Sequence, residues 1–219
     1  MLTILYAPHM TSVDNEAQRA SGYADVPLAA SGREQARELG RHYAAMPLAA
    51  VFSSDLQRAT ETARLAFAHR ALPHLSDARL RECDYGELTR GPVARVEAAF
   101  PGYLSEPFPR GESLLMVVRR VGNFLGEILP VYDGQTIALI GHRATKYGLE
   151  YWCGTQSLAE IVGTPWEWRE VPIWRYQLHA HQLARRAVTP AHPHATPSAA
   201  PGQDAAGDDG WTEQSVPGS

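Results

Sequence analysis

Three short apolar runs are the feature that most constrains the fold of this chain. They lie at residues 2–7, 49–52 and 136–140, and they carry apolar residues on both faces instead of alternating with polar residues. Strands of this kind belong to parallel sheets that are covered by helices on both faces. The sequence therefore predicts an α/β fold, a three-layer sandwich with a mostly parallel central sheet.

Segments with helical spacing separate these runs. The first is predicted to begin at Ser31, since Ser31 and Glu34 have the spacing of a capping box, and to continue to about Ala45. Further helices are predicted over residues 56–69, over residues 114–128 and from just after His142. In the helix over 114–128, apolar residues define one buried face, and four polar residues are assigned to a solvated side: Arg119, Arg120, Asn123 and Glu127.

The domain organisation follows from length and local composition. A chain of 219 residues suits one domain, placed at residues 1–185, followed by a tail. Residues from about 89 to 111 are rich in glycine and proline, with one helical turn over about 93–99, and they are predicted to form an insertion or lid outside the core. A last strand is expected over 173–180. Residues 186–219 have little to bury, so we expect a disordered tail.

Composition excludes several classes of function. The formal net charge of -4 argues against a nucleic acid partner. Cys83 and Cys153 lack the spacing of a metal site and are predicted to be free thiols, so no metal or other cofactor is proposed. Without a leader or an apolar run of ~20 residues, no membrane association is expected, and we predict a cytoplasmic protein. The oligomeric state stays open, a dimer included.

Four chemically useful residues follow predicted strands or begin the next element. They are His9, Arg58, Glu82 and His142. The carboxyl ends of parallel strands share one edge of the sheet, where ligands bind in open α/β folds. The two imidazoles, the guanidinium and the carboxyl group are therefore expected to converge there.

Each of the later three also has an ordinary structural explanation. The alternatives are Arg58 paired with Glu61 or Asp55 on a helix surface, Glu82 paired with Arg79 or Arg81, and His142 capping the next helix. Taken singly, these explanations are adequate. The order of the residues along the chain favours the functional interpretation.

A longer series of motifs occurs around these four residues. It comprises His9 with Asn15; Gly22, Asp25, Pro27-Leu28, Gly32 and Gln35-Ala36; residues 53–59 with Glu61-Thr62-Ala63; Leu80-Arg81-Glu82 with Gly86; Gly111-Glu112-Ser113; and His142 after an apolar strand. The series resembles the histidine phosphatase, or phosphoglycerate mutase-like, superfamily over roughly the first 180 residues, and several motifs in one order are more specific than any single one.

This resemblance implies phosphoryl transfer through a phosphohistidine. His9 would be the nucleophile and Glu82 the general acid and base, with a small phosphorylated metabolite as the partner. Arg58, His142 and Asn15 would hold the phosphoryl oxygens, where negative charge spreads in the transition state. The expected activity is hydrolysis of a small phosphomonoester.

The residues flanking the two histidines depart from the family pattern. Pro8-His9-Met10 stands where Arg-His-Gly is usual, so a cation and a backbone N–H are missing and a side chain replaces a glycine. Arg143, next to His142, is a candidate replacement phosphate ligand, although it is equally able to point to solvent. Two other functions remain open: acid–base isomerisation or elimination in a reused pocket, and binding of a phosphate ligand with weak catalysis.

Overall fold

Strands and helices alternate along most of the chain in the computed structural model, which describes residues 1–166 and 169–188, with side chains to residue 184. The strands are β1 (Leu2–Pro8), β2 (Ala50–Ser53), β3 (His74–Ser76), β4 (Thr136–Gly141) and β5 (Trp174–Leu178). The α-helices are α1 (Val13–Glu16), α2 (Ala30–Tyr43), α3 (Gln57–Ala66), α4 (Val93–Ala99), α5 (Leu114–Ile128), α6 (Arg143–Cys153), α7 (Leu158–Gly163) and α8 (Ala180–Val188). Short 3₁₀ turns lie at Ala78–Leu80, Gly86–Leu88 and Phe100–Tyr103.

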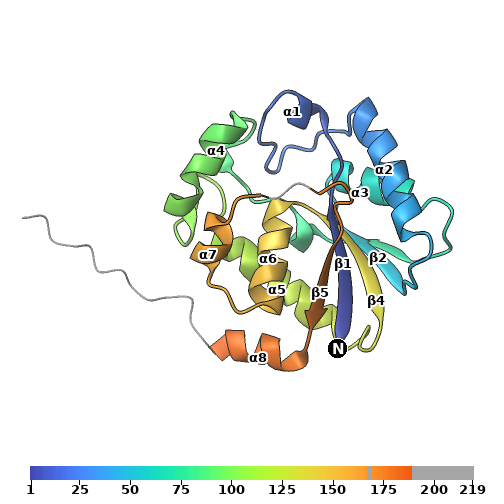
Figure 1. Cartoon of the computed structure of the whole chain (residues 1–219). Helices are drawn as coiled ribbons and strands as arrows, with labels where there is room; N and C mark the ends of the chain where they lie inside the picture. The colour runs from blue at the N-terminus through green and yellow to red at the C-terminus, as the bar shows by residue number, and fades with distance from the viewer. Residues whose placement is uncertain (167–168, 189–219) are drawn as a thin grey trace, which may run out of the picture.

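The strands form one sheet in the order β3-β2-β4-β1-β5. All neighbours are parallel except β1 and β5, which run antiparallel. β1 lies at the centre of Figure 1, between β4 and β5. The mostly parallel sheet predicted from the apolar runs is confirmed.

Helices cover both faces of this sheet. Leu2, Ile4 and Tyr6 of β1 belong to the larger hydrophobic core, together with residues of α5 and α6. The intervening Leu5 and Ala7 belong to a second core with residues of α2 and α3. Because successive side chains of a strand point to opposite faces, α5 and α6 pack on one side and α2 and α3 on the other, as Figure 1 shows. The predicted three-layer arrangement is confirmed.

The predicted capping box at the start of α2 is wrong. α2 begins at Ala30, so Ser31 lies within the helix, and its hydroxyl donates to Glu16 at 2.8 Å. The earlier start has a tertiary cause: the Ala29 N–H donates to the Thr11 carbonyl oxygen at 3.0 Å, which ties the chain to the segment after β1. Gly32 then packs so closely that a Cβ atom there would lie 2.0 Å from the Thr11 oxygen.

The segment predicted to be a lid contributes to the core. It contains α4, as expected, but Val96, Phe100 and Phe108 are buried in the larger hydrophobic cluster. The interpretation as an insertion outside the core is therefore wrong for these side chains.

At the other end of the domain, α8 extends across the boundary predicted at residue 185, and residues 189–219 of the predicted tail lie outside the described residues. Within the described ranges, no helix has the length and hydropathy to cross a bilayer.

Candidate active site

The predicted site residues gather at the carboxyl ends of the parallel strands. His9 follows β1, His142 follows β4, Arg58 begins the helix after β2, and Glu82 lies beyond β3. A cavity of about 930 Å³ is lined by His9, Arg58, Glu82, Asn15 and Arg143, among others. His142 is fully buried next to it, with its ring centroid 5.0 Å from that of His9. The structure therefore brings all six predicted residues to one place.

The His9 imidazole is held in a single tautomer. Its Nδ1 atom lies 2.8 Å from the Met10 carbonyl oxygen, and its Nε2 atom accepts a hydrogen bond of 3.2 Å from Arg58 Nε. A carbonyl only accepts, so Nδ1 carries the proton and Nε2 presents its lone pair. Burial, followed by the charge of Arg58, lowers the pKa of His9 to about 3, against a smaller opposing effect of the Met10 carbonyl. Neutral His9 thus offers Nε2 as a nucleophile.

Arg58 is a buried cation beside that nucleophile. Its Nη1 and Nη2 atoms donate to the carbonyl oxygens of Ala24 and Gly22, each at 2.8 Å, and its residue exposure is 1%. No carboxylate of the described residues pairs with it, because Glu61 binds Arg33 and Asp55 binds Arg81. The alternative explanation, in which Arg58 pairs with Glu61 or Asp55 on a helix surface, is therefore wrong. Burial lowers the pKa of the guanidinium, and the nearby Glu82 partly offsets this effect.

The segment over residues 20–25 holds Arg58 in place. Gly22 has φ +51°, a left-handed conformation that glycine adopts without strain, and its carbonyl oxygen accepts from Arg58. Asp25 accepts from the backbone N–H of Gln57 at 2.6 Å, which satisfies a donor at the N-terminus of α3. Gly22 therefore helps to orient the guanidinium, and Asp25 fixes the start of the helix that carries Arg58.

Glu82 faces the cavity with one oxygen anchored. Its Oε1 atom accepts from the backbone N–H groups of Cys83 at 2.7 Å and Ala144 at 3.2 Å. Ala144 lies in the first turn of α6, where free N–H groups favour an anion. Oε2 has no hydrogen-bond partner within the described part of the chain, so it is open to exchange a proton with a ligand. The alternative pairing of Glu82 with Arg79 or Arg81 is wrong, because these arginines bind Asp77 and Asp55.

His142 occupies the N-cap position of α6, as its structural alternative predicted. Neither ring nitrogen has a hydrogen-bond partner among the described residues, although the side chain is fully buried. Burial, with further effects of Arg58 and His9, lowers the pKa of His142 well below its usual value. Buried polar atoms are normally hydrogen-bonded, so these unpaired nitrogens mark a place where a polar ligand would fit.

Asn15 is held by local hydrogen bonds, whereas Met10 is held by contacts with α3 and the core. The Asn15 amide oxygen accepts from the N–H and hydroxyl groups of Ser12, both at 2.9 Å, and Asn15 is among the residues that line the cavity. The Met10 N–H donates to Thr62 Oγ1 at 3.1 Å, and the Met10 side chain is buried in the core beside α2 and α3. Met10 therefore directs its side chain largely into the core, while its backbone N–H is already occupied.

Arg143 lines the cavity but is engaged elsewhere. Its Nε atom donates to the Tyr147 hydroxyl at 2.6 Å, Nη1 pairs with Glu97 of α4, and the guanidinium lies over the rings of Phe100 and Trp166. It does not point to solvent as the structural alternative held. Its charge is balanced by Glu97, so in this geometry it braces the cavity wall.

The residues that support the loop of Glu82 are not among those predicted from the sequence. Helical spacing predicts Arg120 on the solvated side of α5, yet its side chain is 14% exposed and donates to backbone carbonyls of the segment that carries Glu82 and to Glu112. One signal was present: Arg120 lies three residues after Val117 and four before Phe124, at the edge of the apolar stripe. The described residues contain no group of three or more potential metal ligands from histidine, cysteine, aspartate and glutamate.

Residues 9–177 match the family described as the histidine phosphatase superfamily (branch 1). Over 149 residues the chain is 26% identical to "Uncharacterized phosphatase PhoE" of Bacillus subtilis, covering 68% of this chain and 76% of that protein. It is 28% identical over 178 residues to "Probable phosphoglycerate mutase GpmB" of Citrobacter koseri, covering 78% and 79%. The solved structure of Bacillus stearothermophilus YhfR is similar in fold, with a TM-score of 0.71, 24% identity and coverage of 82% and 93%.

Proposed function

Since the chain belongs to the histidine phosphatase superfamily, whose matched relatives are named as phosphatases and mutases, we propose that it hydrolyses a small phosphomonoester through a phosphohistidine on His9. The observation that carries this proposal is the contact between His9 Nε2 and Arg58 Nε at 3.2 Å. It sets a neutral nucleophile directly beside a buried cation that has no carboxylate partner among the described residues.

In the first half of the reaction, His9 Nε2 gives up the hydrogen bond that it accepts from Arg58 Nε and attacks phosphorus with the same lone pair. The P–N bond forms as the bond from phosphorus to the ester oxygen breaks, and the protonated Glu82 carboxyl group gives its proton to the departing oxygen. Arg58 faces the transferring group with a positive charge, and the Asn15 amide and the buried His142 imidazole are the further proposed ligands of its oxygens. Stabilising the spread negative charge is the main task in such a transition state.

In the second half, water attacks the phosphohistidine. The P–O bond to water forms, the P–N bond breaks, and the Glu82 carboxylate takes the proton from the water. Oε1 stays bound to the two backbone N–H groups, and Oε2 is the atom placed to exchange the proton. One carboxyl group therefore serves as acid and then as base.

The residues on either side of His9 limit the number of backbone N–H groups that can donate a hydrogen bond to a phosphate. Pro8 has no N–H, and the Met10 N–H is occupied by Thr62. The oxygens of a phosphoryl group would accordingly depend on side chains more than on the backbone next to the nucleophile. The same shortage favours a second candidate, a protein that binds a phosphate ligand and turns it over slowly.

Trapping of the phosphoenzyme distinguishes these candidates. We expect that ³²P-labelled substrates from a screen of small phosphomonoesters label the wild type with an acid-labile, base-stable phosphate, and that His9→Ala removes both labelling and phosphate release. His69→Ala is the matched control, since this histidine is exposed and outside the cavity. Turnover that persists in His9→Ala would overturn the proposal, and ligand binding with little labelling and only slow turnover would support the second candidate.

A further inference from the structure

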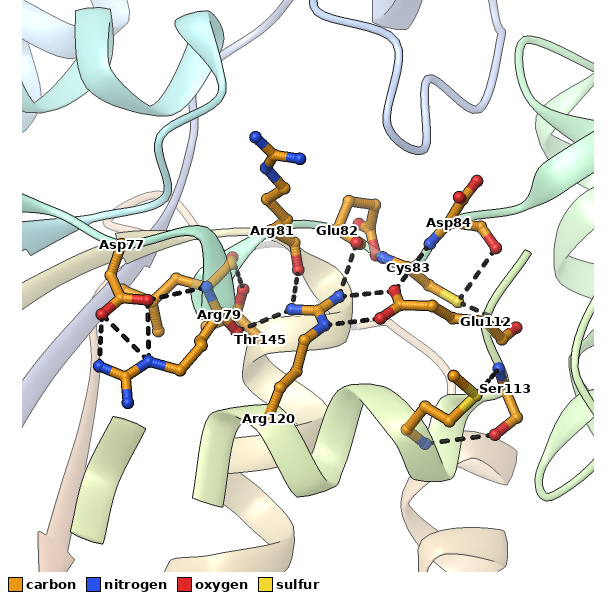
Figure 2. Close-up of polar contacts among 12 residues, drawn as sticks. Asp77, Arg79, Arg81, Glu82, Cys83, Asp84, Glu112, Ser113, Arg120 and Thr145 are labelled. Atoms are coloured by element: carbon orange, nitrogen blue, oxygen red, sulfur yellow. Dashed lines mark hydrogen bonds and ion pairs between the residues drawn. The ribbon is translucent and has the colours of Figure 1, made fainter. Parts of the chain in front are cut away.

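The loop that carries Glu82 is held by an arginine on the opposite element, α5. Arg120 Nη1 donates to the carbonyl oxygens of Arg79 and Arg81, each at 2.7 Å, and Nη2 donates to that of Glu82 at 2.8 Å. Figure 2 shows the guanidinium of Arg120 below this loop, with its donors directed at the backbone.

The remaining donors of Arg120 bind a carboxylate. Nε and Nη2 lie 3.0 Å from Oε1 and Oε2 of Glu112, a bidentate pair with side chains 14% and 16% exposed. A guanidinium has five N–H donors, and these contacts use all of them. Arg120 therefore has no donor left for a ligand, and all of its hydrogen bonds stabilise the loop of Glu82 or the pair with Glu112.

Glu112 continues the support to the far side of Glu82. Its Oε2 atom accepts from the Asp84 N–H at 3.1 Å, and its own backbone N–H donates to the Asp84 carbonyl oxygen at 2.9 Å. The carbonyl of Leu80, between those bound by Arg120, accepts from Thr145 Oγ1 at 2.8 Å. The backbone on both sides of Glu82 is thus fixed at successive residues.

We propose that Arg120, through its pair with Glu112, is a positioning residue that sets the Glu82 carboxyl group at the proton-transfer distance from the leaving oxygen. The inference rests on the proposed function, in which Glu82 is the general acid. Arg120 lines no part of the cavity and touches no reacting atom. It acts on the main chain of Glu82, and displacement of a reacting group by about 1 Å costs up to ~10²-fold in rate.

A lysine at position 120 separates positioning from charge. Its ammonium group keeps the positive charge beside Glu112 but has three donors from one atom, so it lacks the planar fork that reaches two carbonyls and a carboxylate together. Arg119→Lys is the matched control, because Arg119 precedes it on α5 and is exposed. Glu112→Gln is the second variant, to be used if Arg120→Lys does not fold, since it retains an amide oxygen for Arg120.

The test compares leaving groups. A phenol as acidic as p-nitrophenol departs without a proton, whereas an alkoxide needs one from Glu82. We expect Arg120→Lys to slow formation of the phosphoenzyme in single turnover by ~10–100-fold from an alkyl phosphate hydrolysed by the wild type, to change its formation from p-nitrophenyl phosphate little, and to leave Arg119→Lys at the wild-type level for both.

Each result decides the inference. Equal losses with the two substrates, or wild-type rates with both, in a folded Arg120→Lys or Glu112→Gln would overturn it, since a merely structural defect does not depend on the leaving group. Labelling of His9 in the wild type tests the proposed function separately. If the wild type forms the phosphoenzyme but Arg120→Lys shows no difference between the two leaving groups, the positioning role of Arg120 is wrong and the proposed function is unaffected.

Discussion

Two arginines near this site, the buried Arg58 and the partly buried Arg120, use their donors differently. Arg120 pairs with a carboxylate, and all five of its N–H groups donate hydrogen bonds to other parts of the protein. Arg58 donates to His9 and to two carbonyl oxygens, and no carboxylate of the described residues pairs with it. Two of its donors are therefore unused by the described part of the chain.

This difference indicates that Arg120 supports the structure of the site, whereas Arg58 is available to bind a ligand. A charge buried without a counter-ion is costly, and it persists in a fold when something else supplies the opposite charge. For Arg58 the proposed phosphoryl group does so. For Arg120 the protein itself is the partner, so substitution of Arg120 should first disturb the structure around Glu82.

The largest expected effect is on stability. Arg120→Met leaves Glu112 as an unpaired, mostly buried carboxylate, and breaking such a pair costs ~3–5 kcal/mol of the free energy of unfolding. Arg58→Met strands no carboxylate and should cost less. Urea unfolding at pH 7 measures both variants, and equal losses would remove the proposed distinction between the two arginines.

The second effect concerns catalysis by Arg58. Arg58→Met should lower kcat by ~10²–10³-fold, equivalent to about 2.7–4 kcal/mol, because a preorganised donor at the transferring group is removed. The loss should be the same for p-nitrophenyl and alkyl phosphates, unlike that of Arg120→Lys. Steady-state kinetics with both substrates checks this, and a loss confined to the alkyl ester would place Arg58 with the proton-transfer machinery.

The third effect is a dependence of stability on pH. Because the pKa of His9 in the fold is about 3, below the value near 6.5 of an unfolded chain, acidification between these values protonates the unfolded state alone. The free energy of unfolding should therefore fall as the pH drops, by at most about 1.4 kcal/mol per pH unit for each such histidine, and His142 acts in the same direction.

His9→Asn removes one of these two contributions. Unfolding by urea between about pH 4.5 and 6.5 should accordingly give a shallower slope for this variant than for the wild type. His69→Asn, a change at an exposed histidine, is the control. An unchanged slope in His9→Asn would show that His9 titrates normally in the fold.

The smallest effect is expected at Arg143. Its charge is balanced by Glu97 and its guanidinium lies over aromatic rings, so Arg143→Ala should raise KM by about fivefold, roughly 1 kcal/mol, with little change in kcat. Arg95→Ala, at an exposed position of α4, is the control. A ~10²-fold fall in kcat would instead show that Arg143 leaves Glu97 to bind the phosphoryl group, as the replacement arginine hypothesised from the sequence.

The local pattern of apolar residues was sufficient to predict the parallel sheet and the convergence of the site residues at one edge of it. The apolar runs at residues 2–7 and 136–140 became central parallel strands, and the residues following them share one edge, because parallel strands end on the same side. The order of motifs identified the family. Periodicity also placed the buried face of α5 correctly, since burial of an apolar stripe depends on spacing alone.

Interactions between distant segments decided the rest. The start of α2 depends on Thr11, the support of Glu82 depends on Arg120 some 38 residues away, and the engagement of Arg143 depends on Glu97. Helical spacing assigns a polar side chain to water unless a partner is known, and these partners come from elements that only the packed fold brings together. The sequence alone determined which groups meet at the site; the tertiary structure determined which of them remain free to act.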